Sequence, residues 1–196
     1  MTTILLVSTN PGKLDELRSL FETDEKAESR WQFALTPYPL EVDETGATFI
    51  ENATLKAQAG AKTFNQPCLA DDSGLCVEAL GGRPGIHSAR YAATPEARIA
   101  RLLDELAGTS QRQAAFVCAM ALAWPDGRLI TVEGRCEGTI LIAPCGTGGF
   151  GYDPIFFHAP SGRTFAELSK AEKNRFSHRA QAAAALKTAL AGSAIG

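Results

Sequence analysis

The chain has 196 residues, of which 45% are hydrophobic and 21% are charged, and its formal net charge is −3. This length is enough for one domain with a substantial buried interior, and the composition is that of a globular protein rather than a disordered one. The acidic balance and the lack of a lysine/arginine block argue against nucleic acid or a membrane surface as a partner. A small basic pocket for a phosphorylated ligand remains compatible with this balance. We expect a single domain over residues 1–196.

Cysteine and histidine usage restricts the metal and redox chemistry. The odd number of cysteines, none of them in a CxxC pair, predicts buried thiols rather than a disulfide framework or a zinc site. With only three histidines, any metal is expected to be a hard cation held by carboxylates and substrate oxygens. The first residues contain no basic leader, and no apolar run reaches the length of a membrane span. We therefore expect a cytoplasmic protein.

The first half of the chain predicts alternating strands and helices. The apolar run "TILLVS" (3–8) is typical of a buried strand, and it is followed by the polar loop "TNPGK" and a helical pattern in "LDELRSLF". A second strand is predicted over 31–38. The amphipathic pattern of 47–64 predicts a helix with an apolar stripe and with Asn52 and Lys56 together on another face. The stripe comprises Ile50, Ala53, Ala57, Ala61 and Phe64. "PCLADDSGL" then predicts a strand that ends in a polar cluster.

The second half predicts a β-meander between helices. Residues 81–91 are rich in glycine and proline and are predicted to form a loop, followed by a helix over 95–107. Two apolar strands, 113–124 and 128–143, flank the turn sequence Pro125-Asp126-Gly127. A glycine-rich loop leads into another strand, and 169–192 is predicted to be one long helix that opens with a capping box of Ser169 and Glu172. The pattern predicts an α/β protein with a mixed sheet.

Two segments are candidates for binding phosphate and metal. "STNPGK" (8–13) connects a strand to a helix, where backbone N–H groups and the Lys13 ammonium suit an anion, although a simple helix-capping turn would have the same sequence. The acidic residues are Glu41, Asp43, Glu44, Asp71 and Asp72. Neighbouring residues in a strand point to opposite faces, so Asp71 and Asp72 are not expected to bind one ion together. A solvated turn is the alternative.

Two further segments are candidates for binding a planar base and phosphate oxygens. The glycines of "GGFGYD" (148–153) allow close approach of a ligand, and Phe150 or Tyr152 could stack on a base or belong to the core. Lys173, His178 and Arg179 in "EKNRFSHR" are expected on one helix, either facing a ligand or forming a solvated basic face. Together the four segments predict a pocket for a nucleoside polyphosphate with Mg²⁺.

Five stretches carry a resemblance to a known family. They are "STNPGKLDEL", "ETGATFIENATLKA", "LADDSGLCVEALGGRPGIHSARYA", "GTGGFGYDPIF" and "LSKAEKNRFSHRAQA". In this order, from about residue 4 to residue 190, they resemble the inosine/xanthosine triphosphate pyrophosphatase family, also called HAM1-like or RdgB-type. The resemblance implies an elongated, two-lobed α/β molecule with a long central mixed β-sheet flanked by helices and a substrate cleft between the lobes. It also implies a homodimer that uses Mg²⁺.

The resemblance implies hydrolysis of ITP, dITP and XTP to the nucleoside monophosphate and pyrophosphate, which clears deaminated purines from the nucleotide pool. Asp72 would be the general base and, with Glu44, a metal ligand; Glu41 is the alternative to Glu44 because the preceding loop varies in length. The substrate-binding residues implied are Ser8, Thr9, Asn10, Pro11, Gly12, Lys13, Lys56, Ser73, Phe150, Gly151, Tyr152, Asp153, Lys173, His178 and Arg179. "STN" replaces the family's commoner "TGN".

Two other functions stay open at this point. A Maf-like pyrophosphatase acting on pyrimidine or modified nucleotides could share the fold, although the "SHR" and "FGYD" segments favour a purine. A nucleotide-binding module without turnover is the other alternative, and the presence of Asp72, Lys13 and Lys56 argues against it.

Overall fold

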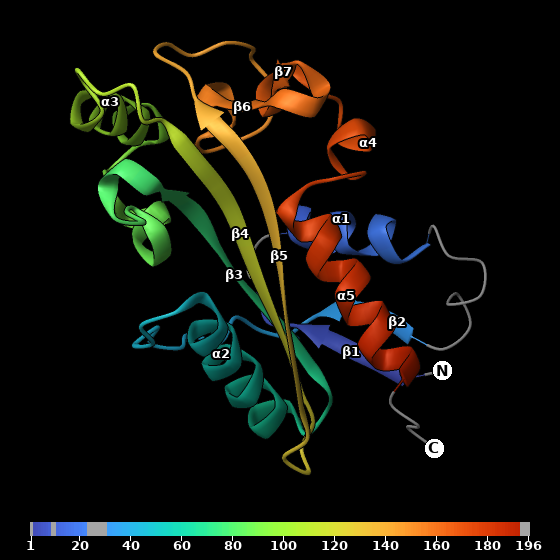
Figure 1. Cartoon of the computed structure of the whole chain (residues 1–196). Coiled ribbons are helices and arrows are strands. Elements are labelled where there is room, and N and C mark those ends of the chain that lie inside the picture. The colour runs from blue at the N-terminus through green and yellow to red at the C-terminus, as the bar shows by residue number, and fades with distance from the viewer. Residues whose placement is uncertain (1, 9–10, 23–30, 193–196) are drawn as a thin grey trace. The chain divides into compact units, whose positions relative to one another are not determined.

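A computed structural model of the chain describes residues 2–8, 11–22 and 31–192 (Figure 1). Within these ranges the helices are α1 (Pro11–Glu22), α2 (Phe49–Phe64), α3 (Pro95–Glu105), α4 (Lys170–Lys173) and α5 (His178–Gly192). The strands are β1 (Thr2–Leu6), β2 (Trp31–Leu35), β3 (Cys68–Val77), β4 (Gln113–Ala123), β5 (Leu129–Ile140), β6 (Phe156–His158) and β7 (Arg163–Thr164). These strands form one sheet in the order β2-β1-β3-β4-β5-β6-β7. β1 runs parallel to β2 and β3, whereas β6 is antiparallel to β5 and β7, which confirms the prediction of a mixed α/β sheet.

The chain divides into two compact units. The first comprises Met1–Asp72, Cys118–Gly134 and Ala180–Gly196, and the second comprises Ser73–Val117 and Arg135–Arg179. The strands β3, β4 and β5 each contribute residues to both units. The boundary within β3 separates Asp72 from Ser73, so the motif "ADDSGL" contributes to both units.

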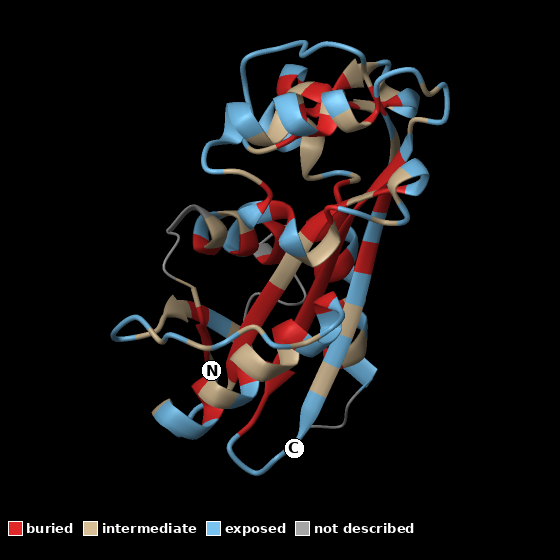
Figure 2. Ribbon diagram, turned by 90° about the vertical axis from the view of Figure 1, so that its left-hand side faces the viewer, coloured by how far each residue is buried: buried red, intermediate tan, exposed pale blue. Residues whose placement is uncertain are grey.

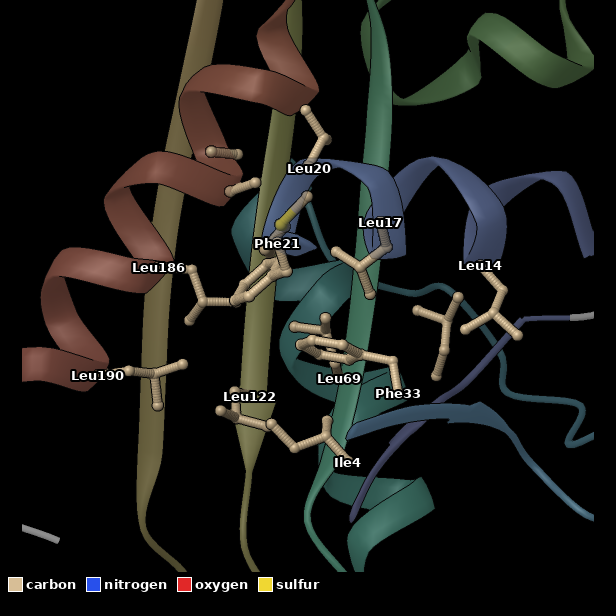
Figure 3. Packing of buried hydrophobic residues seen from close by; sticks show 14 of the residues in the cluster. Ile4, Leu14, Leu17, Leu20, Phe21, Phe33, Leu69, Leu122, Leu186 and Leu190 are labelled. Atoms are coloured by element: carbon tan, nitrogen blue, oxygen red, sulfur yellow. The ribbon is translucent and has the colours of Figure 1, made fainter. Parts of the chain in front are cut away.

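The core of the first unit is formed by α1, α5 and residues of the strands β1, β2, β3 and β4 (Figure 3). The helical spacing of Leu14, Leu17 and Phe21 predicts one apolar face on α1, and all three side chains are buried. The rings of Phe21 and Phe33 meet edge to face with centroids 4.6 Å apart, and Phe33 pairs in register with Ile4 of β1. The N-terminal strand–loop–helix arrangement therefore positions Lys13 on the first turn of α1.

Helix α2 begins one residue after Thr48, which forms a capping box with Glu51. The predicted apolar stripe is correct for Ala53, Ala57 and Ala61, which are buried, but wrong for Ile50, which is 37% exposed. Phe49 is buried in its place, because the capping box starts the helix at Phe49 and turns this position inward. Asn52 is also completely buried, which the amphipathic pattern did not predict.

The core of the second unit is aromatic. The rings of Phe116, Phe156 and Phe165 contact one another with centroid distances of 4.5 to 5.6 Å. Leu102 and Leu106 of the segment around α3 are fully buried in the same cluster, as their spacing predicts. β4 is buried over almost its whole length, whereas β5 alternates between buried and exposed positions (Figure 2).

Two predicted elements are wrong in extent. β3 does not end at the polar cluster but continues through it to Val77. The helix expected over 169–192 is two helices, α4 and α5, with residues 174–177 between them. Phe176 in this break stacks on the His158 ring with centroids 4.1 Å apart, a contact that draws the chain inward. Asn174 and Ser177 are the signal in the sequence, because both residue types disfavour helix interiors.

All five cysteines are free thiols, as their spacing predicts. The expectation that they are buried is correct for Cys68, Cys118 and Cys136 but wrong for Cys76, which is half-buried, and for Cys145, which is exposed. Burial raises the pKa of Cys68 and Cys136 to about 11, which keeps both as unreactive thiols. None of the helices in the described ranges combines the length and the apolar character that crossing a membrane would require.

Candidate active site

The predicted phosphate- and metal-binding residues of the first unit meet in one group of polar side chains. This carboxylate–lysine cluster consists of Lys13, Glu44, Asn52, Lys56, Asp71 and Asp72. Its members come from α1, from the segment before α2, from α2 itself and from the middle of β3. Residues separated by up to 58 positions in the sequence thus lie within hydrogen-bond distance of one another.

Asp71 and Lys13 form an ion pair. The Lys13 ammonium donates to both carboxylate oxygens of Asp71, at 2.8 and 3.0 Å, and Asp71 is only 7% exposed. A nearly buried carboxylate needs such a partner, because the desolvation of an uncompensated charge is costly. The pair fixes the Lys13 side chain at the start of α1, where the resemblance implies contact with phosphate.

Lys56 connects two acidic segments. Its ammonium donates to Oε1 of Glu44 at 2.6 Å and to the backbone carbonyl of Asp71 at 2.8 Å. These bonds use two of the three donors of the ammonium group. Glu44 is therefore tied to α2, whereas Glu41 is exposed. This difference favours Glu44 over Glu41 as the residue whose position the fold controls.

Asp72 has a different partner from Asp71. Nδ2 of Asn52 donates to Oδ2 of Asp72 at 3.0 Å, while Oδ1 of Asn52 accepts the backbone N–H of Gly46 at 2.9 Å. The two neighbouring carboxylates thus have separate partners on α1 and α2, as the alternation of side chains along a strand predicts. Asn52 was absent from the candidate residues, and its spacing of four from Lys56 was the available signal.

The oxygen donors of this cluster suit a hard divalent cation. Asp72 and Glu44 offer carboxylates, and Mg²⁺ commonly takes one or two of these and completes its shell with water and phosphate oxygens. Over the described ranges, with residues 9–10 and 23–30 left aside, no group of three or more His, Cys, Asp or Glu side chains could hold a metal by itself. Two carboxylates suit such a cation when its remaining ligands are water and phosphate oxygens.

The remaining predicted phosphate-binding residues are described only in part. Ser8 follows β1, is half-buried, and donates its backbone N–H to the Leu6 carbonyl at 3.0 Å. Pro11 and Gly12 form the first turn of α1. Thr9 and Asn10 lie outside the described residues. Ser73, which is half-buried on β3, belongs to the second unit.

The predicted base-binding residues of the second unit also converge. We call Phe150, Asp153, Phe165, Lys173 and Arg179 the aromatic–cation cluster. The Lys173 ammonium lies 4.9 Å from the ring centroids of both Phe150 and Phe165, and the Arg179 guanidinium lies 5.6 Å from that of Phe150. Such distances allow an attraction between each cation and the ring face. Phe150 is 60% exposed, so its ring is accessible to a planar ligand.

Asp153 organises the glycine-rich loop. Its Oδ2 accepts the backbone N–H of Phe150 at 2.9 Å and the Lys173 ammonium at 2.6 Å, and the residue is 2% exposed. Gly149 has a φ of +71°, and a Cβ at that position would lie 2.2 Å from the same oxygen. Glycine is therefore required there both for the backbone conformation and for space.

Tyr152 and His178 are both buried, which agrees with the core position considered for Tyr152 and excludes a solvated position for His178. The hydroxyl of Tyr152 donates to the Ser88 carbonyl at 3.0 Å, and burial raises the pKa of Tyr152 to about 12. His178 is 5% exposed, and its ring stacks on Phe116 with centroids 5.0 Å apart. Tyr152 anchors the loop next to Gly151, whose φ is +60°.

Lys173 and the pair His178-Arg179 were expected on one helix, which is wrong. Lys173 ends α4, and His178 begins α5. The break between these helices nevertheless leaves Lys173 and Arg179 near the same ring, that of Phe150. The aromatic–cation cluster is therefore assembled by tertiary structure and not by helical periodicity.

The described residues form a mixed seven-stranded sheet flanked by helices, which defines an α/β protein. Its acidic cluster, paired to lysines, has the groups that suit a hard cation and phosphate oxygens. The sequence pattern of the Ham1 family matches residues 4–189, and the chain belongs to this family.

Comparison with known proteins gives relatives that match over nearly their whole length. A dITP/XTP pyrophosphatase of Nostoc sp. is 50% identical over 188 residues, which cover 95% of this chain and 93% of the relative. A dITP/XTP pyrophosphatase of Synechocystis sp. is 49% identical over 183 residues, covering 93% and 92%. Among solved structures, a HAM1 protein from Coxiella burnetii matches with a TM-score of 0.88 at 41% identity, covering 98% of this chain and 100% of that one.

Proposed function

We propose that this protein is a nucleoside triphosphate pyrophosphatase that hydrolyses ITP, dITP and XTP to the nucleoside monophosphate and pyrophosphate. This activity is supported by the similarity to proteins named dITP/XTP pyrophosphatase, which are 49% and 50% identical in sequence over nearly the whole chain. The observation that carries the chemistry is the carboxylate–lysine cluster. It combines a carboxylate, that of Asp72, which is suited to deprotonating water, with two ammonium groups suited to binding phosphate.

In this proposal Asp72 is the general base. It accepts a proton from water, the water oxygen forms a bond to the α-phosphorus, and the bond from that phosphorus to the bridging oxygen breaks. Pyrophosphate leaves with the electron pair of the broken bond. Most of the acceleration comes from positioning and from stabilisation of charge on the phosphate oxygens, as in other phosphoryl transfers.

The residues of the first unit bind the phosphate end. Lys13 and Lys56 are the cations, and Ser8, Thr9, Asn10 and Gly12 supply backbone and side-chain donors at the start of α1. Pro11, which has no N–H to donate, occupies the first position of the helix. Mg²⁺ would be held by Asp72 and Glu44 and, when bound, would neutralise charge on the phosphate oxygens. Both lysines already pair with acids, and these pairs hold the two ammonium groups in position for the phosphate end.

The residues of the second unit bind the base end. Phe150 stacks on the purine, and Ser73, Gly151, Tyr152, Asp153 and Lys173 shape the surrounding surface. His178 and Arg179, with backbone amides of the loop, donate hydrogen bonds to the 6-oxo group. An adenine amino group cannot accept these bonds, and leaving polar groups unpaired is what makes rejection strong.

Residues 1–196 in this proposal form a single functional domain to which both units contribute. We further propose that the protein acts in the cytoplasm as a homodimer, in line with the family resemblance. Neither nucleic acid nor a membrane is a partner in this proposal, which agrees with the net charge of −3.

Pyrophosphate release from ITP, XTP, ATP and dUTP with Mg²⁺, measured as phosphate after adding inorganic pyrophosphatase, tests the function. We expect release from ITP and XTP and little from ATP and dUTP. A preference for dUTP would favour a Maf-like enzyme for pyrimidine or modified nucleotides. Tight binding of ITP without any product would favour a nucleotide-binding module.

A further inference from the structure

Asn52 is a completely buried polar residue near the start of α2. It is 0% exposed, and its side-chain amide bonds to two different segments. A buried amide is costly unless its donors and acceptors find partners. A nonpolar residue would avoid this cost at an inward-facing position, so the presence of the amide needs an explanation.

The hydrogen-bond geometry determines which way the amide points. The backbone N–H of Gly46 can only donate, so the Asn52 atom that faces it at 2.9 Å must be the carbonyl oxygen. The NH₂ group is then directed at Oδ2 of Asp72, 3.0 Å away, and it donates to the carboxylate. The asymmetry of these two partners leaves a single satisfactory orientation.

The segment before α2 is packed tightly on this amide. A Cβ on Gly46 would lie 2.8 Å from Oδ1 of Asn52 and 2.6 Å from Cβ of Glu51. The segment that carries Glu44 therefore approaches α2 as closely as a glycine allows. One turn further along α2, Lys56 binds Glu44 itself.

One face of α2 thus determines where two acidic side chains lie. Asn52 and Lys56 are four residues apart and share this face, as the periodicity of a helix requires. Asn52 bonds to Asp72 on β3, and Lys56 bonds to Glu44 and to the Asp71 carbonyl. The helix links the segment before it to the strand through side chains of fixed length.

We propose that Asn52 is a positioning residue of the hydrolytic reaction. It fixes the carboxylate of Asp72 through Oδ2, and its bond to Gly46 holds the segment that carries Glu44 at the same end of α2. The inference rests on the proposed function, in which Asp72 is the general base. A general base that can rotate away from its water deprotonates that water less often, while the phosphate-binding lysines and the residues that bind the purine stay in place. Loss of Asn52 therefore lowers kcat and leaves KM nearly unchanged.

Two substitutions separate the two bonds of the amide. Asn52→Asp keeps the shape and the acceptor for Gly46 but removes the donor to Asp72. Asn52→Ala removes both. Gln58→Ala, at an exposed position of the same helix, is the matched control. Steady-state hydrolysis of ITP, thermal melting and circular dichroism are measured for each purified protein.

We expect kcat of both Asn52 variants to fall about 100-fold, the scale of a misplaced catalytic group, with KM within about threefold of wild type. Gln58→Ala should match wild type in both constants. If a folded Asn52→Ala protein keeps its kcat, or if the loss merely follows the folded fraction, the proposal is overturned. Failure of both variants to fold would make Asn52 a folding determinant and would also overturn it. Absence of ITP hydrolysis by the wild type would instead refute the proposed function.

Discussion

The carboxylate–lysine cluster and the aromatic–cation cluster compensate charge in different ways. In the first, three donors from two helices each have their own acid: Lys13 with Asp71, Asn52 with Asp72, and Lys56 with Glu44. In the second, a single buried acid, Asp153, receives both a loop N–H and the Lys173 ammonium. Lys173 also lies over the ring faces of Phe150 and Phe165, and Arg179 lies over that of Phe150.

This difference matches the two ends of the proposed substrate. Lysines held by carboxylates can exchange partners with phosphate oxygens, because both partners offer the same kind of charge-assisted bond. An exposed aromatic ring with cations near it offers a planar surface for a base together with donors at its edge. Substitutions in the first cluster should therefore change the chemical step and phosphate binding, and those in the second should change selectivity.

Asp72→Asn should have the largest effect. The substitution keeps the side chain's size and removes the base, so kcat for ITP should fall by about 10³-fold or more, in the range measured for general bases. Binding of ITP, followed by calorimetry in the presence of Ca²⁺ to suppress turnover, should persist. An Asp72→Asn enzyme with kcat within tenfold of wild type would remove Asp72 from the role of base.

Asp71→Asn should have a smaller effect on a different constant. Loss of the charged partner leaves Lys13 less well positioned, so KM for ITP should rise about tenfold, and stability should fall by about 1.5–3 kcal/mol, the scale of a charge-assisted hydrogen bond. Urea denaturation and steady-state kinetics measure the two changes. Asp15→Asn, at an exposed acid on the same helix as Lys13, is the control, and an equal change in both proteins would contradict a specific role for the Lys13–Asp71 pair.

Arg179→Ala tests the selectivity of the second cluster. KM for ITP should rise about tenfold, corresponding to one lost charge-assisted bond, whereas the slow hydrolysis of ATP should change much less. The control is Arg175→Ala, which removes an exposed arginine from the break between α4 and α5. Equal losses on ITP and ATP would show that Arg179 contributes binding without discrimination.

The smallest effect should come from the ion pair of Glu172 with Arg163, which attaches α4, the helix that ends in Lys173, to β7. Arg163 donates to Glu172 at 2.6 Å, and this bond, followed by bonds from Ser169, lowers the pKa of Glu172 from 4.5 to about 2. A group whose pKa is depressed by folding stabilises the folded state above its ordinary pKa, and the contribution is lost as the pH falls towards the depressed value. Glu172→Gln should thus be slightly less stable than wild type at pH 6, and the difference should shrink between pH 4.5 and about 2.

Urea denaturation at low salt over this pH range measures the difference, since salt screens exposed pairs. A difference that does not depend on pH would show that the carboxylate's charge is irrelevant to α4.

The elements with strong periodicity were predicted correctly, and the failures occur where a tertiary contact competes with local preference. The patterns of Leu14, Leu17 and Phe21 on α1 and of Ala53, Ala57 and Ala61 on α2 follow from burial of one helix face. The break before α5 was missed, because the stacking of Phe176 on His158 is a contact between distant segments. Asn52 was missed as a member of the cluster for the same reason: its partners lie 6 and 20 residues away.

The amino-acid sequence alone determined the mixed α/β class, the free thiols and the short motifs that carry the family resemblance, because these depend on local periodicity and on residue chemistry. Tertiary structure decided which charges meet. Only the folded chain pairs Lys13 with Asp71 rather than Asp72, turns Tyr152 inward towards Ser88 and brings Lys173 and Arg179 to one ring from two helices. Such pairings depend on distances between segments far apart in the chain, and spacing along the sequence does not contain them.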